Sequence, residues 1–188
     1  MKLQTRTLLT LAGIIILNFN LTIIEANGQG KGDITVGGGL AFRTLSFSGV
    51  GDVPSFIGIN ARGSYQISDN IILAPDLTFF FPKTEGTFDW NIFEFNANGN
   101  YLFTSTGEGL QLYALAGLNF TRVKYDFEGI GGFGGFGGSF SDTNVGFNLG
   151  GGLNYPINDN VAPFAELKFT VAGYDGFGGV FGVKFKVN

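Results

Sequence analysis

The residues of this chain that could do chemistry are a small set of charged side chains scattered among apolar ones. Charged residues make up 14% of the sequence, against about 25% in an average soluble domain. The chain has no His and no Cys, so it lacks the commonest general base and the thiolate ligands of zinc. No Ser lies in a recognisable nucleophile context. We therefore predict a protein that is not an enzyme and uses no cofactor and no metal, and the net charge of −4 gives no sign of nucleic-acid binding.

Six of the charged residues share the polar positions of alternating apolar and polar segments. If these segments are strands, the charges lie on one face and the large apolar residues on the other. Buried charges must be paired, because an isolated ion is very costly to remove from water. Both signs are present in near balance, so we predict a hydrogen-bonded ion-pair network of Arg62, Asp76, Glu94, Glu166, Lys168 and Lys184, with Arg43 and Lys186 toward its ends. Asp76 and Glu166 are the candidate partners of Lys184.

Eight segments after residue 33 must position these charges. The expected strands are 34–43, 57–67, 71–81, 93–103, 110–121, 145–155, 161–171 and 179–188. Short turns at 68–70, 104–109 and 158–160 alternate with longer loops at 45–54, 82–88, 126–143 and 175–178. This arrangement is typical of a transmembrane β-barrel, in which the short turns are periplasmic and the longer loops extracellular. We predict an all-β fold, an eight-stranded antiparallel up-and-down transmembrane barrel over residues 29–188, closed by pairing of the last strand with the first.

Two features predict local irregularity in these strands. Pro75 and Pro163 have no backbone N–H to donate a hydrogen bond to the neighbouring strand, so we expect them near strand starts or at bulges. Residues 88–91 break the alternation and place Trp90 on the polar side, which indicates a bulge or a loop there.

The size of the side chains decides which face is outside. The interior of a closed eight-stranded barrel is only wide enough for side chains to fill it. The alternate positions that carry Phe, Leu, Ile and Val would overfill that space, so we expect these side chains to face lipid. The small polar side chains at the other positions should then face the lumen. A soluble lipocalin-like barrel is the alternative, although it needs more surface charge. Aromatic residues at the periplasmic strand ends fit an interfacial girdle: Tyr65, Tyr101, Phe103, Tyr155 and Phe185.

The first 28 residues are typical of an export signal. Lys2 and Arg6 precede an apolar run over residues 8–17, and Ala26 and Gly28 suit the small positions of a signal peptidase site. We predict a cleaved signal peptide over residues 1–28, with an uncleaved membrane anchor as the alternative. The rest of the chain has no apolar stretch approaching the roughly 20 residues of a transmembrane helix.

The chain end carries a further motif. Gly182, Phe185 and Val187 resemble the C-terminal signal of barrel proteins, although Val180 stands where that signal has a polar residue. With the export signal, the eight segments and the alternating loops, the chain resembles the small OmpA/OmpX-like outer-membrane barrels, also described as porin-like or opacity-type. That resemblance implies a bacterial outer-membrane location, contact with outer-membrane lipids and lipopolysaccharide, insertion by the barrel-assembly machinery, and a lumen filled by ion pairs.

The longest loop repeats Gly-Gly-Phe between residues 129 and 140. Its period of three fits neither a strand nor a helix, and we predict exposed contact residues at Phe133, Phe136 and Phe140. A strand extension or a loosely constrained tip is the alternative. Just before the loop, Arg122 and Lys124 either contact lipopolysaccharide phosphates or snorkel.

Together these features favour a non-enzymatic outer-membrane barrel with a plugged lumen and a structural or surface-interaction (adhesion) role through its extracellular loops. A narrow porin-like or hydrophobic-solute channel is the alternative function. A barrel enzyme acting on lipid or peptide ranks third, because known barrels of that kind rely on His.

Overall fold

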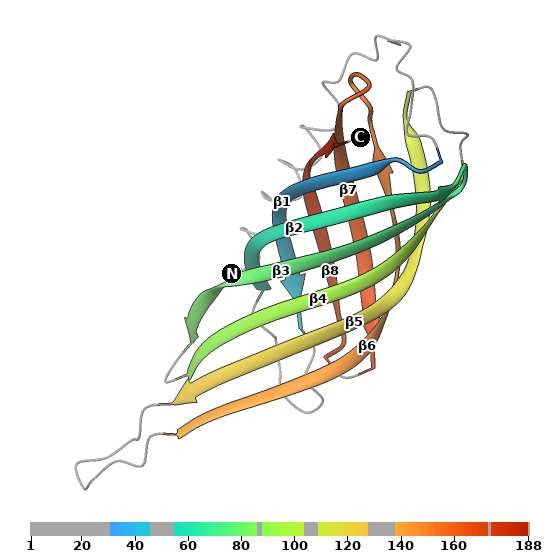
Figure 1. Ribbon diagram of the computed structural model, residues 1–188. Coiled ribbons are helices and arrows are strands. Elements are labelled where there is room, and N and C mark those ends of the chain that lie inside the picture. Colours follow the sequence, from blue (N-terminus) through green and yellow to red (C-terminus); the bar gives the residue numbers. More distant parts are fainter. Residues whose placement is uncertain are drawn as a thin grey trace, which may run out of the picture.

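The computed structural model describes residues 31–45, 55–85, 88–103, 109–127, 138–172 and 174–187 (Figure 1). The predicted signal peptide, residues 1–28, lies outside this part. The described residues form eight strands: β1 (Ile34–Thr44), β2 (Ser55–Ser68), β3 (Ile71–Glu85), β4 (Phe88–Leu102), β5 (Gln111–Phe127), β6 (Gly138–Asn154), β7 (Val161–Val171) and β8 (Gly176–Lys186). Within the same ranges there is no helix long and apolar enough to cross a membrane.

The strands form one closed antiparallel barrel in chain order, so the predicted fold class is confirmed. The closing seam joins β8 to β1, with Leu40 opposite Phe181 and Gly39 opposite Gly182. A side chain at Gly39 would run into the Phe181 carbonyl, which explains why glycine stands at this point of the seam. The seam removes the free edges that an open sheet would leave to other chains.

Alternation along each strand gives the barrel its two faces. Large apolar side chains point outward, as at Leu40 and Phe181, which are 61% and 66% exposed. Their neighbours of the other parity point inward and are mostly polar and buried, such as Asn60, Thr78 and Asn96. At the end with the short turns, which the sequence predicts to be periplasmic, Tyr65, Tyr101, Phe103 and Phe185 are exposed on the outer face, whereas Tyr155 is half-buried. The outer face is therefore the apolar one, as the volume of its side chains requires.

The predicted irregularities lie close to where the sequence placed them. In the β3–β4 ladder, Phe80 pairs with Ile92 and Lys83 pairs with Trp90, so β3 has one residue more than β4 between the two pairs. The bulge is therefore real, and the extra residue belongs to β3. Pro163 is the third residue of β7, near its start. Pro75 is the fifth residue of β3, where the β2–β3 ladder skips the positions between the Arg62–Asp76 and Tyr65–Leu73 pairs. The register shift of this ladder lies between Gln66 and Ser68, so Pro75 is not at a bulge.

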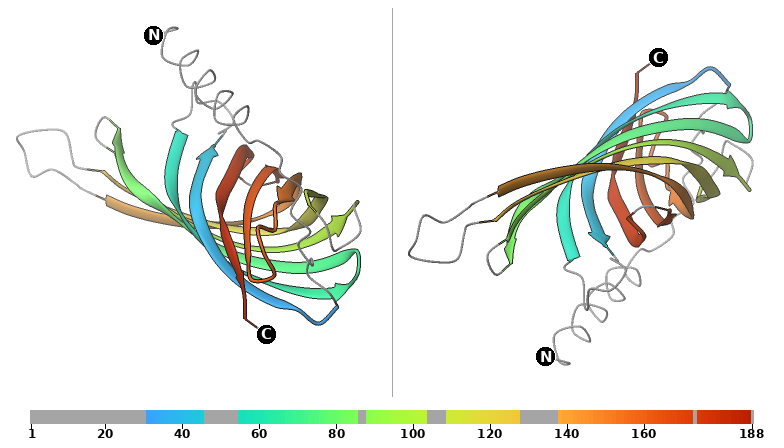
Figure 2. Two further views of the ribbon diagram at one scale, coloured as in Figure 1. Left: turned by 90° about the horizontal axis from the view of Figure 1, so that it is seen from above. Right: turned by 90° about the horizontal axis from the view of Figure 1, so that it is seen from below.

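Strand lengths differ from the prediction on the extracellular side. Residues 82–88 and 126–143 were expected to be loops, but β3 continues to Glu85, β4 begins at Phe88, β5 continues to Phe127 and β6 begins at Gly138. The 175–178 loop is likewise shorter, because β8 begins at Gly176. Strands β5 and β6 have 17 residues each, whereas β1, β7 and β8 have 11. The ends of β3 to β6 therefore project beyond the rest of the barrel, as Figures 1 and 2 show. We call this part, residues 81–85, 88–91, 122–127 and 138–144, the protruding sheet.

Tight turns close the other end. Residues 69 and 70 connect β2 to β3, as predicted. In the turn before β7, the Asn158 side-chain oxygen accepts hydrogen bonds from the backbone N–H groups of Asn160 and Val161, each at 2.9 Å. Such an Asx turn fixes the chain reversal locally, which is why Asn and Asp mark it in the sequence.

Candidate functional site

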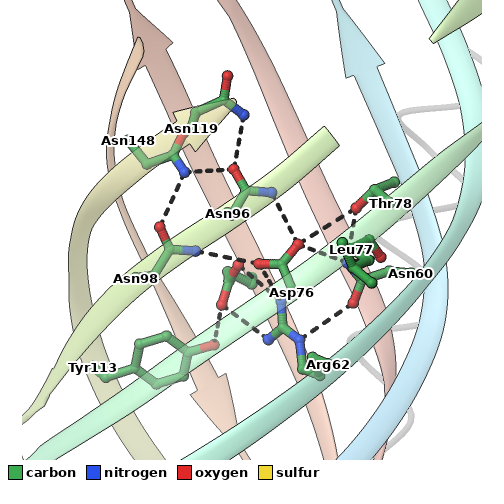
Figure 3. A network of polar contacts seen from close by, with 11 residues as sticks. Asn60, Arg62, Asp76, Leu77, Thr78, Asn96, Asn98, Tyr113, Asn119 and Asn148 are labelled. Atoms are coloured by element: carbon green, nitrogen blue, oxygen red, sulfur yellow. Dashed lines mark hydrogen bonds and ion pairs between the residues drawn. The ribbon is translucent and has the colours of Figure 1, made fainter. Parts of the chain in front are cut away.

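The centre of the barrel interior holds an ion pair between β2 and β7. The Arg62 guanidinium donates to both Glu166 carboxylate oxygens, each at 3.0 Å, and lies 3.9 Å from the nearer oxygen of Asp76 (Figure 3). The Phe164 ring lies 4.2 Å from the guanidinium carbon, and the Tyr113 hydroxyl donates to Glu166 at 2.9 Å. A bidentate arginine–carboxylate pair is geometrically specific, so these contacts fix both side chains in place.

Asparagine amides, which the sequence analysis did not single out, hold Asp76. Its carboxylate accepts amide hydrogen bonds from Asn60 and Asn96 at 2.9 Å and from Asn98 at 3.3 Å. Asn96 in turn accepts from Asn119 and Asn148, each at 2.8 Å (Figure 3). The sequence feature that could have predicted this network is the recurrence of Asn at the inward-facing positions of β2, β4, β5 and β6. An Asn amide both donates and accepts hydrogen bonds, so it can extend a network from one strand to the next.

Glu94 belongs to a second ion pair nearer the extracellular side. Its partner is Arg43, and both side chains are almost completely buried. Arg43 also donates to the Thr170 hydroxyl at 3.3 Å and to the Tyr174 carbonyl at 2.7 Å. Thr170 donates to Asn148 at 2.8 Å, so neutral side chains connect this pair to the central one. Arg43, which the sequence placed at the margin of the network, therefore anchors the connection between β7 and β8.

The two inward lysines do not find the carboxylates that were expected. Lys184 donates to the Asn154 amide oxygen at 2.6 Å and lies 5.7 Å from the Phe164 ring, so the expectation of Asp76 or Glu166 as its partner was wrong. Lys168 is 5% exposed, and its ammonium makes no hydrogen bond within the described residues. At the periplasmic end Lys186 pairs with Asp33 at 2.7 Å. Strand geometry explains the difference, because inward side chains at different heights cannot all reach the few carboxylates.

Apolar side chains are buried inside the barrel above and below the polar centre. The extracellular apolar layer includes Leu45, Phe56, Phe80, Ile92 and Val123, and Trp90 and Tyr174 pack against it. The periplasmic apolar layer consists of Ile72, Ala74, Leu102, Tyr113 and Leu115. The sequence analysis assigned small polar residues to the interior and did not anticipate these layers. These residues lie at inward-facing positions near the strand ends, and this placement is the sequence feature that could have predicted the two layers.

The Gly/Phe segment is only partly described. Phe133 and Phe136 lie outside the described residues. Phe140 was expected in a loop but lies in β6, opposite Tyr125 of β5, and is 54% exposed. Two residues further along β6, the Asp142 carboxylate accepts hydrogen bonds from the Tyr174 hydroxyl at 3.0 Å and from the Asn144 amide at 3.3 Å. For Phe140 the strand-extension alternative is therefore the correct one, and β6 contacts the β7–β8 connection.

A closed, even-stranded antiparallel barrel with an apolar outer face and a polar interior defines an outer-membrane barrel protein. Residues 19–186 match the family model for the outer membrane protein beta-barrel domain. The chain belongs to this family, and it is located in the bacterial outer membrane. Among curated proteins, none matches the sequence.

Solved structures of small outer-membrane barrels share the fold. Ail, the attachment invasion locus protein of Yersinia pestis, is 16% identical with a TM-score of 0.61 over 84% of this chain and 99% of its own. Neisserial surface protein A (NspA) is 20% identical with a TM-score of 0.63 over 82% and 96%. OprG from Pseudomonas aeruginosa is 14% identical with a TM-score of 0.62 over 87% and 100%. At these identities the likeness concerns the fold.

Proposed function

We propose that this protein is a non-enzymatic outer-membrane barrel that takes part in surface interaction, such as adhesion, through its protruding sheet and extracellular loops. The observation that carries the proposal is the unequal height of the barrel wall. The β6–β7 ladder ends at the Phe147–Val171 pair, yet β6 continues to Gly138 while still paired with β5. A membrane-spanning barrel does not need these additional residues, so they are available for contact outside the membrane.

The filled interior supports this proposal. Between the two apolar layers, the Arg62–Glu166 pair and the asparagine amides occupy the lumen, and we propose that together they plug it. A plugged interior would stabilise the folded barrel and fix its shape. The function would then depend on the exposed surface. A projecting strand edge can also bind an extended segment of another protein by adding a strand to the sheet. The described part of β7 does not reach the edge of β6 above Gly146.

The membrane partners follow from the outer surface. Arg122 and Lys124 are exposed on the outer face of β5, directly above the outward-facing Phe120. Cations at that height suit the phosphates of lipopolysaccharide, and the apolar band below them suits lipid chains. The C-terminal strand, with Gly182, Phe185 and Val187, is the segment that the barrel-assembly machinery would recognise during insertion.

Shortening the protruding sheet tests the proposed function. Deleting residues 125–140 and joining the paired positions Lys124 and Ser141 through a two-residue Asn-Gly turn preserves the register below. Cells carrying this variant should adhere less to host cells, while heat-modifiable migration on gels still reports a folded barrel. Deleting only residues 129–136 is the matched control, which separates the Gly/Phe segment from the sheet. Unchanged adhesion with both variants would contradict the proposal.

A narrow channel is the second candidate, and one observation favours it. Buried polar atoms of Gln66, Asn100, Gln111 and Lys168 lack a hydrogen-bond partner within the described residues. Such groups are usually satisfied by ordered water, so water could occupy parts of the lumen. Conductance in planar bilayers that changes in Glu166→Gln or Arg62→Ala variants would favour a channel. If neither variant changed the conductance, the channel function would be excluded.

A further inference from the structure

Two cationic side chains inside the barrel have hydrogen-bond donors without a partner. Within the described residues, neither the Lys168 ammonium nor the Arg43 Nε–H donates a hydrogen bond. Both residues are almost completely buried, at 5% and 2% exposure. The other nitrogens of Arg43 are occupied by Glu94, Thr170 and the Tyr174 carbonyl. A buried donor without an acceptor is costly, so both groups require an acceptor that the surrounding side chains do not supply.

The strand register brings these two side chains to the same part of the barrel wall. Arg43 of β1 is opposite Gly178 of β8, and Gly178 is opposite Lys168 of β7. The backbones of β1 and β7 are therefore separated only by β8, at about 10 Å. The Arg43 guanidinium crosses this gap, because it donates to Thr170, the next inward residue of β7 after Lys168, at 3.3 Å. Both cross-strand neighbours of Lys168, Gly150 and Gly178, lack side chains, so the wall beside its side chain consists of backbone.

The charges of the buried residues do not balance. Among the described residues, four cations and three carboxylates are buried: Arg43, Arg62, Lys168, Lys184, Asp76, Glu94 and Glu166. One positive charge is therefore unmatched. The ion pairs within the described part of the chain involve neither of the two lysines. Because an uncompensated buried charge is very costly, the interior favours one additional negative charge near a lysine.

The surroundings of the two lysines show which of them needs that charge. Lys184 donates to the Asn154 amide oxygen at 2.6 Å and lies 5.7 Å from the Phe164 ring, and both contacts stabilise a cation. Lys168 makes neither kind of contact within the described residues. The carboxylate two positions away, that of Glu166, is already held in the bidentate ion pair. Ordered water would accept a hydrogen bond from Lys168 but would not neutralise it.

We propose that Lys168 and Arg43 bind a small monovalent anion, such as chloride, inside the barrel. The Lys168 ammonium and the Arg43 Nε–H would donate hydrogen bonds to the anion, which provides the missing acceptor of both groups. Its single charge offsets the one unmatched positive charge of the interior. A lumen filled by side chains excludes large polyatomic anions. The bound anion would connect β1 to β7, and this role does not depend on the proposed surface function.

The test is urea unfolding of the protein in lipid vesicles, with chloride titrated against gluconate at constant ionic strength. Gluconate is the comparison anion because it is too large for the interior. Chloride at about ten times its dissociation constant should lower the unfolding equilibrium constant about tenfold, since only the folded state has the site. The effect should saturate as the site fills, whereas a general effect of salt on the protein surface would not.

Two lysine variants locate the site. Lys168→Met removes the ammonium and keeps an unbranched side chain, so it should abolish the chloride dependence. In gluconate this variant should be at least as stable as the parent protein, because the uncompensated charge is gone. Lys184→Met is the matched control, since it also removes a buried ammonium. It should retain most of the chloride dependence, because Asn154 is the partner of that lysine.

Diffraction from crystals grown in bromide provides a measurement that does not depend on the variants. Its anomalous signal should place bromide within hydrogen-bond distance of Lys168 Nζ and Arg43 Nε. The inference would be overturned by stability that does not respond to chloride, by a Lys168→Met variant that responds like the parent, or by water in place of bromide at Lys168. Bromide bound there without any effect of chloride on stability would indicate binding at crystal concentration only, and would also reject the inference.

Discussion

The membrane-spanning body and the protruding sheet are made from the same strands but have opposite patterns. In the body, outward positions of β5 and β6 are apolar, as at Leu118 and Phe147, and inward positions are polar, as at Asn119 and Asn148. Beyond Phe120 the outward positions become Arg122 and Lys124, opposite Thr143 and Ser141, and all four are exposed. The inward positions become apolar, as at the paired residues Ile92 and Val123, which are both buried.

The reversal of polar and apolar positions shows that the surrounding medium, and not the strand structure itself, determines which face is apolar. Within the bilayer the outer face meets hydrocarbon, whereas above it the outer face meets water. Inside, the polar centre is surrounded by hydrogen-bonded partners, whereas apolar side chains such as Phe56, Ile92 and Val123 pack together toward the extracellular end. The change between Phe120 and Arg122 therefore marks the outer boundary of the apolar band on β5. Four sets of variants test this comparison.

The largest effect is expected at the central ion pair of the body. Glu166→Ala leaves the buried Arg62 without its bidentate partner, and removal of one member of a buried pair costs about 3–5 kcal/mol. Urea unfolding in lipid vesicles, followed by Trp fluorescence, should show a loss of this size. The double variant Arg62→Met with Glu166→Leu removes both charges and should recover most of it. If the single variant were as stable as the parent, the pair would not be a buried, coupled unit.

The outer face provides the next largest contrast. Leu77→Arg introduces a charge near the middle of the apolar band of β3, where a cation facing lipid costs about 2–4 kcal/mol. Thr143→Arg makes a similar change above the boundary and should cost little, because its side chain meets water. The same vesicle unfolding measurement compares the two. Equal costs would place the membrane boundary elsewhere on the barrel.

A smaller effect is expected in the extracellular apolar layer. Ile92 is 2% exposed, and Ile92→Val should cost about 0.5–1.5 kcal/mol because it leaves a small void among fixed neighbours. Ile59→Val on the lipid face is the control. It should cost less, because mobile lipid chains fill the space that the methylene leaves. A larger loss at Ile59 than at Ile92 would show that the layer is loosely packed.

The smallest effect concerns the outer face of the protruding sheet. A hydrogen bond from Ser139, together with Lys124 at 3.2 Å, lowers the pKa of Asp126 below its ordinary value. A lowered carboxyl pKa stabilises the folded sheet above the ordinary pKa, and that contribution is lost as pH falls through the folded value. Ser139→Ala and Lys124→Gln should each raise the pKa of Asp126, because each variant removes a group that stabilises the ionised carboxylate. NMR titration of the carboxyl carbon measures both shifts.

The sequence predicted most accurately where one alternation ran without interruption. Strand β7 was predicted with its observed bounds, and the closing seam between β8 and β1 was predicted from the apolar parity of Phe181, Val183 and Phe185. These predictions succeeded because a strand between lipid and lumen must alternate with a period of two. Where the environment of β5 and β6 changes, the alternation inverts. The predicted strands therefore stopped at Thr121 and began at Val145, although pairing continues to Phe127 and Gly138.

By itself, the sequence determined the strand count, the outward face and the set of inward charges, because each of these depends only on the order of residues along one strand. Only the tertiary structure decided which charges meet. Register and stagger bring Arg62 of β2 to Glu166 of β7, Glu94 to Arg43, and Lys184 to an amide instead of a carboxylate. They also pair the backbone of β6 with that of β5 as far as Phe127 and Gly138. The physical reason is that backbone hydrogen bonds between strands set these contacts, and no pattern within a single strand encodes them.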